Sequence, residues 1–214
     1  MTTGDHLKKF KALSEELCAL IEGEGLAVRP YDQPSLPYFQ RLTSDEQNEA
    51  IHNLEDYLII AKSVVEERYS LKDTAFFLEK ALKHFGYEAD PQIFKYIADD
   101  VLAEVYNAKH TQVFRGILFF EQATYTIEDF YSRQWLHLYD REGQVTQQLF
   151  GAAEQLFVEG KLQTIEPQVD EHILSEKASL LKVKSRVKVL AISLLFKDGK
   201  PAGLFSASRS HLIG

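Results

Sequence analysis

The most unusual arrangement of charged side chains in this sequence lies between positions 182 and 188. Four basic residues alternate strictly with Val and Ser: Lys182, Lys184, Arg186 and Lys188. Because successive side chains of a β-strand point to opposite faces, this spacing places four positive charges on one face. Such a face either stays solvated or binds acidic groups, and the simplest acidic partner is the protein's own helical first half, within one chain or across a dimer. We therefore name these four residues as a candidate docking site for a partner or an anion.

Other polar spacings were weighed for catalysis and metal binding. Glu49 and His52 have the Glu-x-x-His spacing of di-iron bundles, but such a centre needs a second copy and the sequence has none. The adjacent carboxylates Glu55 and Asp56 diverge by about 100° on a helix, so they do not converge on a substrate. No serine lies in a Gly-x-Ser-x-Gly elbow, and a single cysteine, Cys18, excludes a Cys-rich metal site. We expect a non-enzymatic protein with no catalytic residue, no metal and no cofactor.

Aromatic and apolar residues of the second half are candidates for a ligand pocket. The same residues also suit an ordinary core, and as pocket lining they would favour an apolar or planar ligand. The pocket candidates are Phe119, Tyr125, Phe130, Trp135, His137, Tyr139, Ile192 and Phe205.

The charge of the chain is unevenly distributed. Residues 1–109 hold 12 Lys and Arg against 20 Asp and Glu, so this half carries the whole net charge of −8 of the 214-residue chain. An acidic half repels the phosphates of nucleic acids. The N-terminus lacks the apolar core of a signal peptide, and the longest apolar run, Leu190–Phe196, is too short to span a bilayer. We expect a cytoplasmic protein that binds neither nucleic acid nor membrane.

The elements that position these residues differ between the two halves. In residues 1–109, apolar side chains recur every three or four positions, which predicts amphipathic helices over about 6–22, 44–65 and 70–85. Thr43 and Glu46 fit a capping box at the start of the second helix. Asp90-Pro91 predicts a fourth helix that extends to Val105. Four such helices with short connections indicate a small bundle.

Residues 110–214 change to the pattern of strands and short helices. We predict strands over 113–120 and 162–173, a helical turn over 126–130 and a helix over 144–158. A hairpin is predicted from runs 187–196 and 201–209, because Asp198-Gly199 between them suits a type I′ turn with positive φ at both positions. In the first hairpin strand we expect two apolar faces: Val187, Val189, Ala191 and Leu195 on one, and Leu190, Ile192, Leu194 and Phe196 on the other.

Four segments of this half carry a family resemblance. Tyr125–Phe130 and Trp135–Arg141 resemble the short-helix segment and the motif before the main helix of PAS-type sensory domains. Leu162–Glu166 is similar to the strand after that helix, and Val189–Phe205 is similar to the terminal hairpin. The resemblance covers about residues 113–210 and implies an antiparallel sheet that forms a pocket against short helices. The expected fold is therefore α+β, with a helical N-terminal region over 1–109 and a PAS-like domain over 110–214.

The resemblance also implies a class of function. It implies a sensory or regulatory module of a signal-transduction protein, which binds a small ligand or forms a homodimer and acts on a downstream signalling domain or protein. Flavin and haem versions need a pocket cysteine or a main-helix histidine; Cys18 lies elsewhere and 144–158 has no histidine, so no cofactor is expected. Two alternatives stay open: an adaptor without a ligand, and a small-molecule-binding protein of chorismate-lyase-like fold, to which Gly199-Lys200-Pro201 is similar.

Overall fold

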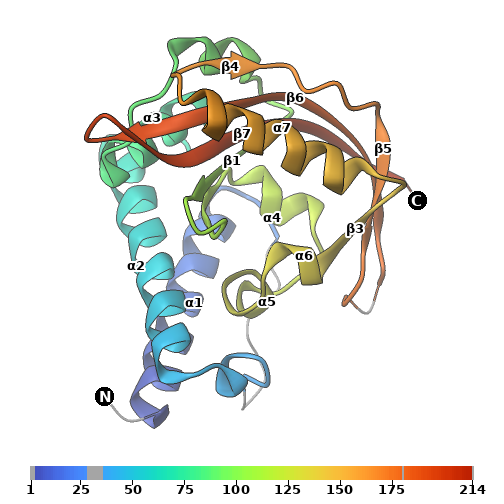
Figure 1. Ribbon diagram of the computed structural model, residues 1–214. Helices are drawn as coiled ribbons and strands as arrows, with labels where there is room; N and C mark the ends of the chain where they lie inside the picture. The colour runs from blue at the N-terminus through green and yellow to red at the C-terminus, as the bar shows by residue number, and fades with distance from the viewer. Residues whose placement is uncertain (1–2, 28–35, 180, 214) are drawn as a thin grey trace.

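The N-terminal part of the computed structural model consists of three long helices (Figure 1). The structure describes residues 3–27, 36–179 and 181–213. The helices are α1 (Thr3–Gly23), α2 (Ser44–Glu66) and α3 (Thr74–Phe85). Across the described ranges, no helix combines the length and the apolar character needed to cross a membrane.

The capping signals explain where these helices begin and end. The capping box of Thr43 and Glu46 is present at the start of α2, as predicted. The predicted start of α3 at Ser70 is wrong, because the carboxylate of Asp73 accepts the N–H of Phe76 at 3.0 Å and begins the helix there. Gly86 ends α3 in the left-handed conformation, with φ of 68°.

A curled antiparallel sheet with short helices follows, so the predicted α+β fold class is confirmed. In the described part of the chain the sheet has seven strands, in the order β2-β1-β7-β6-β5-β3, and β4 pairs with β6. The strands are β1 (Val101–Asn107), β2 (Gln112–Arg115), β3 (Tyr139–Arg141), β4 (Thr164–Ile165), β5 (His172–Glu176), β6 (Lys184–Lys197) and β7 (Lys200–Ile213). The shorter helical elements are η1 (Phe39–Arg41), η2 (Pro91–Tyr96), α4 (Leu118–Gln122), α5 (Ile127–Ser132) and α6 (Trp135–Leu138), and the main helix of this half is α7 (Val145–Glu159).

Strand β1 replaces the second half of the predicted fourth helix, so that prediction is wrong beyond η2. Asp90 caps η2 as expected, but η2 ends at Tyr96. The backbone from Val101 to Asn107 instead pairs with β7 over its whole length, and β2 pairs along its other edge. The apolar spacing of Val101 and Val105 suits a helix as well as a strand, and the pairing with β7 decides between them. The sheet therefore begins before residue 110.

Two further strand predictions are wrong in part. The predicted strand 113–120 ends at Arg115, and the residues after it form α4. The predicted strand 162–173 survives only as the two-residue β4 and the first residues of β5. The helices predicted over 126–130 and 144–158 are confirmed as α5 and α7.

The long hairpin of β6 and β7 confirms the predicted turn, because Asp198 and Gly199 have φ of 53° and 70°. The predicted faces of β6 are wrong on one side of a β-bulge. The register with β7 shifts between Val189 and Ala191, so the alternation of faces changes there. Val189 therefore shares a face with Ile192, and not with Ala191.

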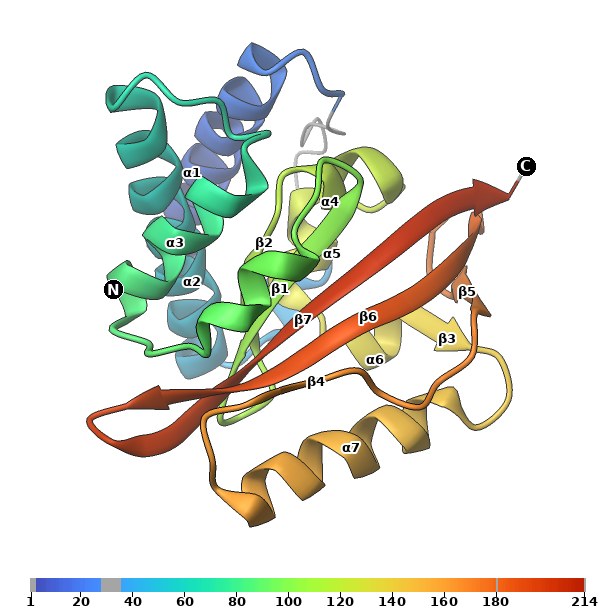
Figure 2. The same cartoon turned by 90° about the horizontal axis from the view of Figure 1, so that it is seen from above.

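The central strands are covered on both faces. One face packs on α1–α3 and the other lies toward α7, which Figure 2 shows on the opposite side of the hairpin. The core between the helices and the sheet includes Phe10, Leu17, Tyr57, Phe77, Ala103, Val105, Phe205 and Ala207. The core under α7 consists of Leu156, Val189, Ile192 and Leu194.

The close approach of β7 to β1 gives a stability prediction at Gly203. A Cβ at this position would overlap the carbonyl oxygen of Tyr106, so we expect Gly203→Ala to lower the free energy of unfolding by about 1–3 kcal/mol. The matched change Gly151→Ala, in α7, meets no atom within 4 Å and should raise it by about 0.5–1 kcal/mol, because alanine is the better helix former. Urea denaturation of both variants measures the two changes. Equal changes of the same sign in the free energy of unfolding would contradict the close packing of β1 on β7.

Candidate functional site

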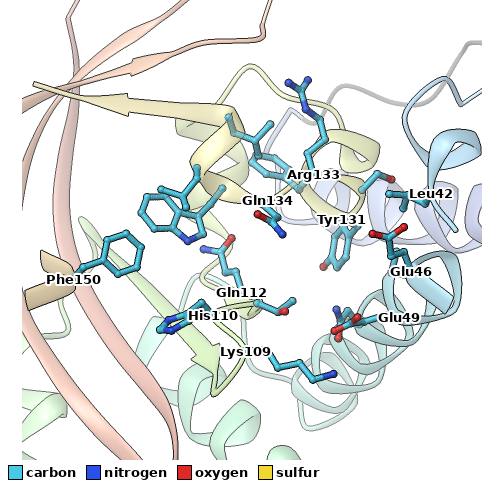
Figure 3. Close-up of a pocket in the computed structure, with 18 residues that line it drawn as sticks. Leu42, Glu46, Glu49, Lys109, His110, Gln112, Tyr131, Arg133, Gln134 and Phe150 are labelled. Atoms are coloured by element: carbon cyan, nitrogen blue, oxygen red, sulfur yellow. The ribbon is translucent and has the colours of Figure 1, made fainter. Parts of the chain in front are cut away.

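A cavity of about 410 Å³ lies where the helical part meets the sheet part of the protein (Figure 3). Its walls are the first turns of α2, the β1–β2 turn over residues 109–112, the segment 130–136 that joins α5 to α6, and Phe150 of α7. We call this the outer cavity. Its volume suits a small organic molecule, and such a molecule would contact both parts of the chain.

The outer cavity has an aromatic side and an acidic side. The ring centroids of Trp135 and Phe150 are 5.9 Å apart with an interplanar angle of 30°, and His110 meets Phe150 edge to face at 6.0 Å. Glu46 and Glu49 project from α2 on the other side, as Figure 3 shows. The two sides offer a flat apolar surface and a negatively charged surface to the same ligand.

Two hydroxyl groups in the wall of this cavity are buried without a hydrogen-bond partner among the described residues. They are Oη of Tyr131 and Oγ of Ser132, whose residue is only 9% exposed. Burial raises the pKa of Tyr131 to about 12, although the charge of Arg115 opposes this, so the phenol stays protonated at neutral pH. Both hydroxyls are therefore able to donate or accept a hydrogen bond. Native proteins leave few buried polar groups without a partner, and a bound water is one group that can complete the hydrogen bonds of these two hydroxyls.

A second cavity, of about 100 Å³, lies between the inner face of the sheet and α7. We call it the inner cavity. His110, Trp135 and Phe150 line it as well as the outer cavity, so these three rings form the partition between the two. Two smaller voids of about 30 Å³ each continue the hollow of the sheet toward β5 and α4.

The inner cavity contains a network of buried charges. The carboxylate of Glu104 accepts hydrogen bonds from Nε2 of Gln112 at 2.5 Å and from the hydroxyl of Tyr106 at 3.1 Å. Burial raises the pKa of Glu104, and the nearby charge of Arg141 opposes that rise. Gln112 lines the outer cavity and one of the smaller voids, and its bond to Glu104 connects the outer cavity to the inner one.

Arg141 lies at the centre of this network. Its Nη1 donates to Nε2 of His172 at 2.8 Å, and Nδ1 of His172 lies 3.0 Å from the carbonyl oxygen of Asp170, which only accepts. The imidazole is therefore neutral, with its proton on Nδ1. Burial lowers the pKa of Arg141, and its buried Nε has no partner in the described ranges.

A second arginine, Arg115, is buried behind the outer cavity and is only 2% exposed. Its guanidinium carbon lies 4.8 Å from the ring centroid of Phe130 and 5.0 Å from that of Tyr131. These aromatic faces supply the cation with favourable electrostatic contacts that replace part of its lost hydration.

Most of the predicted pocket residues line one or other of these spaces. Phe130 and Trp135 line the outer cavity, and Trp135, Ile192 and Phe205 line the inner cavity. Phe119 and Tyr139 line the smaller voids.

Two predicted pocket residues line none of the four spaces described above. The hydroxyl of Tyr125 is buried and donates to the carbonyl oxygen of Leu138, while it accepts the N–H of Ala178 at 3.2 Å. Tyr125 therefore holds α6 and the segment after β5 together. His137 is exposed on α6.

The basic residues of the predicted docking site lie at one end of the sheet. Lys184, Arg186 and Lys188 are exposed at alternate positions of β6, and Lys182 precedes that strand. Arg186 forms an ion pair with Glu171 at 3.5 Å, and Nζ of Lys188 donates to the carbonyl oxygen of Val169 at 2.9 Å. Both partners belong to the segment before β5, so these contacts do not reach α1–α3.

The Glu-x-x-His spacing on α2 builds no metal centre in the described part of the chain. Nε2 of His52 lies 3.5 Å from the carboxylate of Asp56, one turn away, while Glu49 lines the outer cavity. No group of three His, Cys, Asp or Glu residues is placed to hold a metal ion within residues 3–27, 36–179 and 181–213.

Sequence reasoning missed the buried residues Glu104 and His172 and the half-buried residues Gln112 and Arg141. Glu104 had been assigned to a helix, where a glutamate beside apolar residues is ordinary. A signal was present, because in the strand Val101–Asn107 a charged residue falls on a face between Leu102 and Tyr106. Only the pairing of β1 with β7 makes that face an interior one.

Comparisons of this chain with family models, with curated proteins and with solved structures find no match. The features of the molecule that bear on its function are therefore the cavities, the buried charges and the exposed basic strand.

The Arg141–His172 contact makes the stability of the fold depend on pH. Burial lowers the pKa of His172 and Arg141 lowers it further, whereas the bond to the Asp170 carbonyl raises it. The unfolded chain then binds a proton more readily, so the free energy of unfolding should fall as the pH drops below about 6.5, down to the lowered folded pKa. In His172→Gln this fall should be smaller, and urea denaturation over a series of pH values measures it. His137→Gln, at an exposed site, is the control, and identical pH profiles for His172→Gln and the wild type would contradict this role.

Proposed function

We propose that this chain is a non-enzymatic sensory module of PAS type that works in the cytoplasm. It binds a small molecule in the outer cavity and transmits the binding event through the packing of the helices against the sheet. The observation that carries this proposal is the cavity of about 410 Å³ at the junction of the two parts, with buried hydroxyls that lack partners among the described residues. The antiparallel sheet with short helices on its hollow side agrees with the family that the sequence resembles.

The position of the outer cavity suggests how a ligand would act. A molecule there touches α2 on one side and the β1–β2 turn and α5–α6 on the other, so its affinity depends on how these elements are packed. A ligand that prefers one packing shifts the population toward it. The outer cavity is also connected to the inner cavity, where Glu104 and Arg141 lie. Trp135 and Phe150 line both cavities, and Gln112 donates a hydrogen bond to Glu104.

Native mass spectrometry after mild purification tests the proposal. We expect the native mass to exceed the denatured mass by one small molecule, since a cavity of this size with polar groups in its wall retains its ligand. In Asn53→Trp an indole ring enters the outer cavity from α2, and the extra mass should disappear. Glu66→Trp, at an exposed position of the same helix, is the control and should keep it.

The same measurement can contradict the proposal. A wild-type protein that carries no adduct, and whose thermal stability no member of a metabolite library raises, would overturn ligand sensing. An adduct that persists in Asn53→Trp would show that the ligand binds outside the outer cavity.

A second candidate function, an interaction module without a ligand, is favoured by the exposed basic strand. The contacts of Lys184, Arg186 and Lys188 described above leave most of this charge on the surface, while the net charge of −8 lies in residues 1–109. Charge complementarity of this kind fits the acidic helical surface of a second copy, and so a homodimer.

Charge reversal on β6 tests this second function. If a second copy docks there, Lys184→Glu together with Arg186→Glu should convert a dimer to a monomer, because like charges then face each other. Lys197→Glu together with Lys200→Glu, at the exposed hairpin tip, makes the same change of charge elsewhere and should leave the dimer intact. Analytical ultracentrifugation at low and high salt measures both variants. An unchanged oligomeric state in the first double variant would argue against docking on this strand.

A further inference from the structure

The two sides of the outer cavity select for a particular class of ligand. Its wall carries the stacked rings of Trp135 and Phe150 at one side and the carboxylates of Glu46 and Glu49 at the other (Figure 3). We propose, resting on the ligand-sensing function above, that this cavity binds an organic amine that carries a flat aromatic ring. The ring packs against Trp135 and Phe150, and the ammonium group pairs with Glu49.

Glu49 is the carboxylate that remains for a ligand. The neighbouring Glu46 already accepts two hydrogen bonds of 2.8 Å, from the backbone N–H and the hydroxyl of Thr43, in the cap of α2. Those bonds lower the pKa of Glu46, so it contributes a permanent negative charge. In the described ranges the carboxylate of Glu49 has neither an ion pair nor a hydrogen bond, and it faces the cavity in Figure 3.

The basic residues of the wall do not outweigh these carboxylates. Arg133 forms an ion pair with Asp129 at 3.2 Å and lies over the ring of Tyr38, at 4.3 Å from its centroid. Figure 3 shows its guanidinium directed away from Glu46 and Glu49. Lys109 is the remaining basic side chain, and its ammonium lies on the Glu49 side of the cavity, where an amine ligand would take its place.

Neutral polar groups complete the recognition of an ammonium. Oη of Tyr131 and Oγ of Ser132, which have no partner among the described residues, are both able to accept a hydrogen bond from it. Gln112 donates one amide N–H to Glu104 at 2.5 Å, and its carbonyl oxygen Oε1 remains as an acceptor for the ammonium. A carboxylate ligand would instead face the two like charges of Glu46 and Glu49.

The single tryptophan of the chain reports on the site directly, since Trp135 lines the cavity. Titration of the protein with 2-phenylethylamine should change the Trp135 fluorescence, and 3-phenylpropionate, its anionic counterpart, should bind at least about tenfold more weakly. Glu49→Gln should weaken binding of the amine by about tenfold, whereas Glu66→Gln, at an exposed position of the same helix, should leave it unchanged.

In Lys109→Gln the direction of the change in amine affinity distinguishes an amine site from an anion site. This substitution should tighten binding of the amine by a few-fold, because the competing cation is removed, whereas an anion site would lose affinity. Three outcomes would each overturn the amine class. The first is binding of 3-phenylpropionate that equals or exceeds that of the amine, and the second is an equal affinity of Glu49→Gln and Glu66→Gln for the amine. The third is weaker binding of the amine by Lys109→Gln. If native mass spectrometry shows a retained molecule and the amine still fails to bind, the amine class is wrong while ligand sensing stands. A chain that binds neither overturns both.

Discussion

The structure depends on one constraint: the central strands β1, β6 and β7 are covered on both faces. Their outer face packs on α1–α3 in a single apolar core, which includes Tyr57, Phe77, Ala103 and Phe205. Their inner face turns toward α7 and the short helices, where the sheet curls around a hollow. Because apolar burial stabilises a fold in proportion to the area removed from water, neither the helices nor the sheet would be stable with this interface exposed.

The inner face of the sheet is polar where the outer face is apolar. Glu104, Tyr106 and the serines of β7 lie on it, and Arg141 reaches it from β3. Burying charge is costly unless the charges are paired and hydrogen-bonded, and Glu104 and Arg141 meet this condition only in part. Buried polar groups of this kind contribute little to stability.

The outer cavity lies at the boundary between the apolar core and this polar hollow. Its walls come from α2 in the helical part and from the β1–β2 turn, α5 and α6 in the sheet part, so any occupant contacts elements that are far apart in the sequence. Trp135, Phe150 and His110 separate it from the inner cavity by side chains alone, and side chains change rotamer at low cost. If a ligand binds there, as proposed, its affinity depends on the relative position of helices and sheet.

The local signals of the chain predicted a large part of the fold. The capping box at Thr43 and the Asp198-Gly199 turn act through backbone geometry within a few residues, and both are present. The helices α5 and α7 and the α+β class also followed from periodicity. The aromatic pocket candidates were found because apolar residues cluster, and Trp135 does line both cavities.

What local patterns could not decide was any feature that depends on partners distant in the sequence. The segment Val101–Asn107 became a strand because β7 pairs with it, and the bulge at Leu190 reversed the faces of β6 through register with β7. Glu104 was missed for the same reason, since a residue becomes interior only when another element covers it. The sequence by itself determined the two-part α+β plan and the local turns and caps, because these depend on near neighbours. The cavities, the buried charges and the placement of Glu49 opposite Trp135 across the outer cavity were decided by tertiary packing, because they join residues that are far apart along the chain.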